Sequence, residues 1–244
     1  TSFDTSLELN KLAEKKRMPN MLDFIFTEIP EWRAAKKMIE NGLMGKIIKV
    51  SIDWTFLSYD LMNHIKSWKT DVKQGGGALS FYFSHVLYYL EYFLGRIKNI
   101  ECSFSSSEKS LNKGETGIDM TISFENGCMG NAHMDISKTD QQKHKVEFYD
   151  GENTMVLQNF SSDFIDNFEL ILNTSKGTEK IKPDMFLNSS YDESEDPRVK
   201  VIKPIAERFI NWCNTGVAAK PDFQDGLRVQ ELIKMTRVSN SESN

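Results

Sequence analysis

The residues best suited to chemistry in this chain lie between Trp68 and His85. A run of three glycines, Gly75–Gly77, gives a backbone turn that can approach a ligand closely, because glycine has no Cβ. The apolar and aromatic segment behind this turn predicts a buried helix that holds His85 near it. An imidazole in such surroundings can act as a general acid or base near neutral pH. The alternative interpretation is a core histidine with no chemical role.

The other candidate residues carry weaker signals. Lys69 either offers its charge to an anionic substrate group or is an ordinary surface lysine. The glycines do not form a nucleotide-binding loop, since the chain has no G-x-G-x-x-G after a strand and no G-x-x-x-x-G-K-[ST]. We expect His133 to face outwards from a strand, and His144, which lies between two lysines, to be exposed to solvent. His64 lies in a loop-like region that could face a cleft.

Periodicity predicts the elements that position these residues. Apolar residues at helical spacing predict helices over 7–17, 30–41, 202–212 and 227–235, in addition to the helix that carries His85. Alternating apolar and polar residues predict strands over 21–26, 48–56, 118–124, 130–136, 146–149, 155–157 and 168–172. The turn signals Asn126-Gly127 and Asp150-Gly151 predict two hairpins. Alternation on one face only favours an α+β fold with an open, mainly antiparallel sheet and helices packed on one face.

Composition excludes several classes of protein. With 244 residues, 39% of them hydrophobic, the chain can bury a sizeable core. A net charge of −5 and the absence of a long basic cluster make nucleic acid an unexpected partner. No apolar run reaches the roughly 18 to 20 residues that cross a bilayer, and we expect a cytoplasmic protein without a membrane partner. Cys102, Cys128 and Cys213 lie far apart and predict buried free thiols, with no metal site.

Several motifs, taken in order along the chain, resemble those of the Gfo/Idh/MocA oxidoreductases. They are Phe26, Pro30 with its helix to Gly42, Gly45-Lys46-Ile47, Trp68-Lys69, Gly75–Leu79, His85, Leu94-Gly95 and the closing segment 221–230. The resemblance implies a Rossmann domain that binds NAD(P), followed by an α+β domain with the substrate site. On this basis we expect residues 1–28 to be a remnant of the dinucleotide-binding domain. Residues 29–244 would form the C-terminal domain.

The same resemblance implies roles for individual residues. His85 matches the family histidine that takes part in proton transfer at the substrate hydroxyl, and is the expected catalytic residue. Trp68, Lys69, Tyr82 and Ser84 are the expected substrate contacts. The family places an aspartate four residues before the histidine, where this chain has Phe81, so the site is more apolar and lacks one acid/base group.

The expected function is the substrate-binding and oligomerising part of an NAD(P)-dependent oxidoreductase acting on a sugar, sugar derivative or polyol. NAD or NADP is expected in the full-length protein, with no cofactor-binding residue in this chain, which alone would be inactive. A homodimer or higher homo-oligomer is expected, because a sheet with one open face exposes a broad surface. The alternative is a non-catalytic binding or assembly module derived from the same fold.

Overall fold

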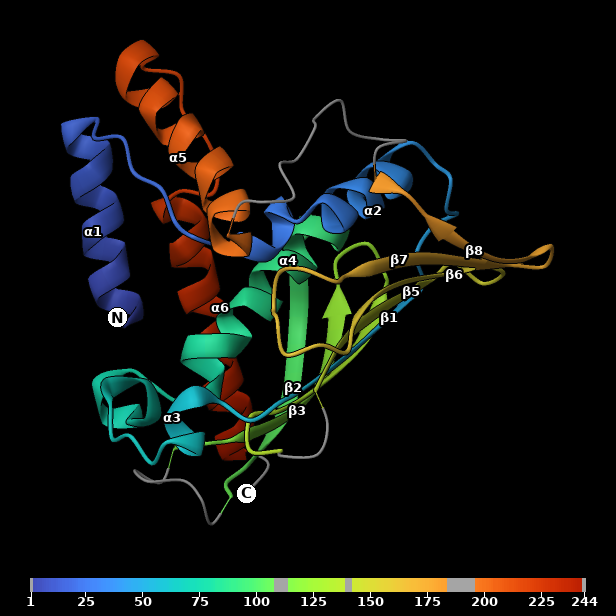
Figure 1. Cartoon of the computed structure of the whole chain (residues 1–244). Helices are drawn as coiled ribbons and strands as arrows, with labels where there is room; N and C mark the ends of the chain where they lie inside the picture. The colour runs from blue at the N-terminus through green and yellow to red at the C-terminus, as the bar shows by residue number, and fades with distance from the viewer. Residues whose placement is uncertain (1, 108–113, 139–141, 184–195, 243–244) are drawn as a thin grey trace.

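The computed structural model describes residues 2–107, 114–138, 142–183 and 196–242 (Figure 1). Its centre is a curved sheet of eight strands in the order β2-β3-β4-β1-β5-β6-β7-β8. β1 runs parallel to β4, and the other neighbouring pairs are antiparallel. The strands are β1 Lys49–Thr55, β2 Ile97–Ser105, β3 Gly117–Phe124, β4 Met129–Asp135, β5 Lys143–Tyr149, β6 Thr154–Asn159, β7 Glu169–Thr174 and β8 Gly177–Ile181.

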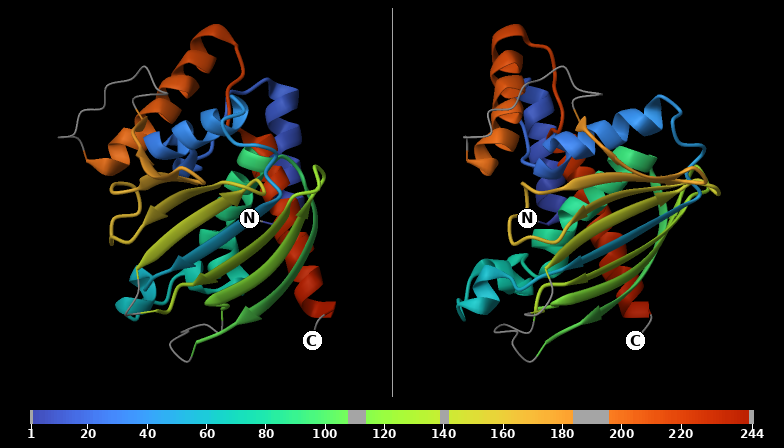
Figure 2. Two further views of the ribbon diagram at one scale, coloured as in Figure 1. Left: turned by 90° about the vertical axis from the view of Figure 1, so that its right-hand side faces the viewer. Right: turned by 45° about the vertical axis from the view of Figure 1, so that its right-hand side comes forward.

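Helices cover one face of this sheet. They are α1 Phe3–Lys16, α2 Pro30–Glu40, α3 Tyr59–Met62, α4 Ser84–Leu94, α5 Pro197–Thr215 and α6 Phe223–Glu242. Shorter turns are the 3-10 turns η1 Ile25–Glu28, η2 Trp68–Thr70 and η3 Val72–Gln74, and the π turn η4 Leu79–Phe83. α4 and α6 lie against the sheet and α1 packs on the outer side of α6 (Figure 1). The left view of Figure 2 shows the opposite face, over which no described helix lies.

The alternation of residue types explains this layering. Along β1, Val50, Ile52 and Trp54 point into the core, while Ser51 and Asp53 lie on the open face. The same alternation runs through the two predicted hairpins, which form β3–β4 and β5–β6. The predicted α+β fold, with an open and mainly antiparallel sheet and helices on one face, is therefore confirmed.

The predicted strand over 21–26 is wrong. This segment is irregular until η1 begins at Ile25. Its backbone is hydrogen-bonded to the loop before α6, where Leu22 donates its N–H to the carbonyl of Pro221 at 3.0 Å. The apolar residues alternate in 21–26 because Phe24 and Phe26 both face α4, where they contact His85.

Two of the three cysteines follow the prediction. Cys102 and Cys128 are buried. The prediction is wrong for Cys213, which is exposed near the end of α5. α5 rises away from the sheet (Figure 1), and its buried residues, Val201 and Ile205, lie in its first half.

The glycine run holds the segment Trp68–Lys69 against the start of the π turn. A Cβ on Gly76 would lie 2.0 Å from the carbonyl oxygen of Trp68. Gly77 donates its N–H to the carbonyl of Lys69 at 2.8 Å. At a φ of +96°, a Cβ on Gly77 would lie 2.3 Å from the carboxylate of Glu115. The close approach predicted for these glycines is thus made to the protein itself.

His144 is buried, so the prediction of an exposed side chain is wrong. The alternation of β5 places the neighbouring lysines on the open face and turns His144 into the core. Its ring stacks on Trp54, with centroids 4.3 Å apart, and its Nε2 lies 3.3 Å from the hydroxyl of Tyr89. Burial, assisted by nearby His85, lowers the pKa of His144 to about 3. His133 lies on the open face as predicted, 2.7 Å from Asp119.

The glycine contact predicts the effect of a single methyl group. Gly76→Ala should lower the free energy of unfolding by about 1–3 kcal/mol, because its Cβ overpacks against backbone that cannot move independently. Urea unfolding followed by circular dichroism would measure this loss. Gly45→Ala is the matched control, since its Cβ would lie 3.4 Å from Asp150, an ordinary contact. Equal stability of the two variants would contradict the account of the glycine run.

Burial of His144 predicts a loss of stability in mild acid. The folded-state pKa, about 3, lies below the unfolded value near 6.5, so its contribution is fully present above pH 6.5 and is lost as the pH falls. Between pH 7 and pH 5 the wild type should lose about 2 kcal/mol more of its unfolding free energy than His144→Phe. Denaturant titrations at both pH values measure the difference. His64→Asn, at an exposed histidine, is the control and should behave as the wild type.

Candidate functional site

Four aromatic side chains form a continuous wall beside the helix that carries His85. This aromatic wall consists of Trp68, Phe81, Tyr82 and Phe56. Trp68 meets Phe81 edge to face at 5.6 Å between centroids, Phe81 meets Tyr82 at 4.7 Å, and Tyr82 meets Phe56 at 5.0 Å. The wall runs from the surface into the core, because Trp68 is 51% exposed whereas Phe56 is 1% exposed.

Lys69 places its ammonium group over this wall. Its Nζ lies 4.8 Å from the centre of the Phe81 ring, a cation–π geometry. The short turn that carries Lys69 is fixed at both ends, by Ser67, whose hydroxyl accepts the N–H of Lys69, and by the glycine run. The structure therefore brings together three of the predicted site residues, Trp68, Lys69 and Tyr82.

The π turn carries two residues of the aromatic wall, Phe81 and Tyr82. Leu79 and Phe83 are its buried residues, while Phe81 and Tyr82 are half-buried. A π turn is wider than an α turn and is frequent at functional sites. Burial, with a further contribution from Asp60, raises the pKa of Tyr82 to about 12, so its hydroxyl stays protonated.

His85 lies just beyond the wall, against different rings. Phe24 and Phe26 meet it at 5.7 and 5.6 Å, each nearly perpendicular to the imidazole. Its Nδ1 is buried without a hydrogen-bond partner among the described residues. Burial, partly opposed by Asp23, lowers the pKa of His85 to about 4. The imidazole is therefore neutral at physiological pH and holds one N–H and one lone pair.

Ser84, a predicted substrate contact, has its hydroxyl bonded to the neighbouring backbone. Its hydroxyl donates to the carbonyl of Phe81 at 3.4 Å, within the same helix. This bond is long, and the side chain is half-buried.

Sequence reasoning missed several rings of the site. Phe24 and Phe26 were assigned to a strand, and no local signal shows that they face His85. Phe56 was placed on the buried face of its strand, but its contact with Tyr82 depends on the path of the π turn. His144 joins the same cluster through Phe26, at 5.0 Å. Strict alternation along β5 is the signal that could have found it.

The described residues hold no group of three or more histidine, cysteine, aspartate or glutamate side chains that could bind a metal ion. Within the same residues, no helix is both long and apolar enough to cross a membrane.

Comparisons with known proteins agree with this architecture. A family model described as the GFO/IDH/MocA C-terminal domain matches residues 32–156, more than half of the chain. An uncharacterized oxidoreductase of Synechocystis sp. is 20% identical over 265 aligned positions, which cover 98% of this chain and 68% of that protein.

Solved structures share the fold at low sequence identity. Levoglucosan dehydrogenase, in complex with NADH and levoglucosan, superposes with a TM-score of 0.77 at 19% identity, covering 100% of this chain and 70% of that one. An aldose-aldose oxidoreductase from Caulobacter crescentus, complexed with glycerol, gives a TM-score of 0.80 at 14% identity over 100% and 68% of the two chains. Together with the family model, these matches show that the chain belongs to the GFO/IDH/MocA family of oxidoreductases and carries its C-terminal domain.

Proposed function

We propose that this chain forms the substrate-binding part of an NAD(P)-dependent oxidoreductase that acts on a sugar, a sugar derivative or a polyol. In this proposal residues 29–244 are the substrate domain, and residues 1–28 are the last part of a dinucleotide-binding domain. Similar proteins support the substrate class, since levoglucosan dehydrogenase is described with levoglucosan and the Caulobacter enzyme with glycerol.

The aromatic wall with Lys69 above it is the observation that carries the proposal. Aromatic faces pack against the C–H faces of a sugar, and a nearby ammonium group can donate to its hydroxyl groups. Trp68 and Lys69 lie on the exposed side of this wall, where a ligand can reach them. Tyr82 adds a hydroxyl that stays protonated. Ser84 would contribute only if its hydroxyl left the carbonyl of Phe81.

In this proposal His85 takes the proton of the substrate hydroxyl. Nδ1 is buried, so Nε2 is the ring nitrogen that can face a ligand. A pKa of about 4 keeps the imidazole neutral in the physiological range, with a lone pair free to accept a proton, and makes it a weak base there. Phe24 and Phe26 fix the plane of the ring, which orients that lone pair.

The glycine run does not fit the pyrophosphate of a dinucleotide. Hydride acceptance is the chemistry that NAD(P) supplies, and its pyrophosphate needs open backbone N–H groups. At the glycine run that space is filled, because the carbonyls of Trp68 and Lys69 lie within 2.7 Å of a Cβ built on Gly76. We therefore assign cofactor binding to the full-length protein, and we derive no step through the cofactor from these residues.

A non-catalytic binding module is the second candidate. It is favoured by Phe81, which occupies the position where the family resemblance implies an aspartate. Here the Phe81 ring lies between Trp68 and Tyr82 and beneath Lys69, so the position serves ligand contact and not proton transfer. Such a module would bind a sugar without turning it over.

We also propose that the open face of the sheet mediates a homodimer. Several of its charges are paired within the face, as in Lys143–Asp53 at 2.5 Å and His133–Asp119 at 2.7 Å. A second copy that packed there would cover these pairs without breaking them.

Substitution in the full-length protein tests the catalytic assignment. With NAD or NADP and a panel of sugars, His85→Asn should lower kcat by roughly 10²- to 10⁴-fold, since it keeps a polar group but removes the base. Trp68→Ala should mainly raise KM, because it removes one side of the binding wall. Phe160→Ala, at an aromatic residue that is 57% exposed elsewhere, is the control. Unchanged turnover across pH in His85→Asn would exclude His85, and sugar binding without turnover by the wild type would favour the binding module.

Light scattering tests the dimer. The protein should have twice the monomer mass at micromolar concentration, and Asn131→Arg, in the middle of the open face, should shift it towards monomer. Asn214→Arg, an equivalent change at an exposed position of α5, should leave the mass unchanged. A monomeric wild type would contradict the proposal.

A further inference from the structure

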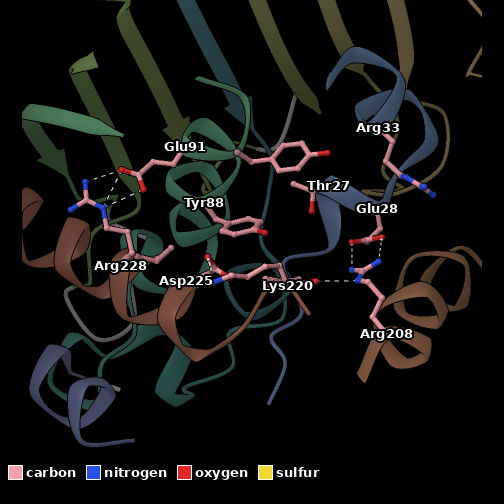
Figure 3. A pocket seen from close by; sticks show the side chains of 12 residues that line it. Thr27, Glu28, Arg33, Tyr88, Glu91, Arg208, Lys220, Asp225 and Arg228 are labelled. Carbon is pink, nitrogen blue, oxygen red and sulfur yellow. Dashed lines mark hydrogen bonds and ion pairs between the residues drawn. The ribbon is translucent and has the colours of Figure 1, made fainter. Parts of the chain in front are cut away.

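A cavity of about 500 Å³ lies beside Tyr88, about one helical turn along α4 from His85. The ring of Phe24 stacks on Tyr88 at 4.1 Å, whereas its edge contact is with His85 at 5.7 Å. Residues from α2, α4, α5, α6, η1 and the loop before α6 line this cavity (Figure 3). It is separate from the aromatic wall, because none of Trp68, Phe81 and Tyr82 lines it.

Three ion pairs lie around this cavity. Arg208 forms a two-pronged contact with the carboxylate of Glu28, at 3.0 and 2.5 Å. At the opposite side Arg228 contacts Glu91 at 2.8 Å, as the dashed lines in Figure 3 show. Lys220 contacts Asp225 at 3.2 Å. An anion that bound Arg208 would have to displace Glu28, whose side chain is only 8% exposed and would lose its ionic partner.

Two phenol groups at the cavity are not used by the protein. The hydroxyls of Tyr88 and Tyr92 have no hydrogen-bond partner among the residues that the structure describes, although both side chains line the cavity. Burial, and then Asp225, raises the pKa of Tyr88, and burial followed by Glu28 raises the pKa of Tyr92 to about 12. Both groups therefore remain O–H donors at physiological pH. A polar ligand in the cavity can accept a hydrogen bond from each hydroxyl in place of water.

We infer that this cavity is a binding site for a neutral polyhydroxylated molecule of monosaccharide size. Such a ligand supplies acceptors for the Tyr88 and Tyr92 hydroxyls and hydroxyl groups for the outer edges of the ion pairs, without breaking a pair. An apolar ligand would leave both phenols unsatisfied, and a charged ligand would compete with Glu28 or Arg208. The volume lies within the roughly 300–1,000 Å³ that is typical of small-molecule sites.

Fluorine NMR of the protein labelled with 3-fluorotyrosine tests this site directly. The chain has seven tyrosines, and Tyr→Phe variants assign their signals. Titration with D-glucose and with sorbitol should shift the Tyr88 and Tyr92 signals saturably. Tyr88→Phe should raise the dissociation constant about fivefold, as expected for one lost neutral hydrogen bond, while the ring and its packing on Phe24 are kept. Tyr92→Phe should have a similar effect, observed on the signal of Tyr88.

The same spectra distinguish this site from the aromatic wall. A saturable shift of Tyr82 alone would support the proposed substrate site and overturn the second one. Tyr59→Phe, at a tyrosine that is 65% exposed, is the matched control and should leave the affinity unchanged. Absence of a saturable shift at Tyr88 and Tyr92 with either compound would overturn the inference. So would an affinity that the two cavity variants leave intact.

Discussion

One phenylalanine ring ties the sheet to the helices that cover it. Phe26 lies at centroid distances of 5.0 to 6.2 Å from five other rings, those of Trp32, Trp54, His85, Tyr89 and His144. These rings come from α2, β1, α4 and β5, and four of the five contacts are nearly perpendicular. Perpendicular contacts fix orientation as well as distance. The plane of His85 is therefore set by the core, and a change in that core is felt at the candidate site.

The outline of the fold is readable in the sequence because strand alternation is local. The segment around Trp54 and the two hairpins have apolar residues at every second position, and a sheet with one covered face requires that pattern. The same rule could have placed His144 inside, but its lysine neighbours suggested solvent instead. Phe24 and Phe26 suggested a strand that does not form. Their alternation is real, but their contacts with α4 reach a helix about 60 residues along the chain, which no local pattern shows.

The sequence predicted several residues of the candidate site but not how they are arranged. Trp68, Lys69 and Tyr82 do come together, and the glycines between them do make a close approach. What the glycine run contacts, however, is the carbonyl of Trp68, so it acts as a spacer for the wall and not as a cradle. A glycine run indicates that another group lies close to the backbone. Which group that is depends on the tertiary fold and cannot be read from the local sequence.

The π turn separates the residues of the aromatic wall from the helix α4, which packs in the core. It holds about one residue more than an α turn, which rotates what precedes it by roughly 100° relative to a regular helix. Phe81 and Tyr82 belong to the widened turn, while His85 and the buried face from Val86 to Phe93 follow it. Gain or loss of one residue here would turn the wall about the helix axis and leave the core packing of α4 in place. Ligand preference in such a site can therefore diverge through helix phase as well as through side-chain identity.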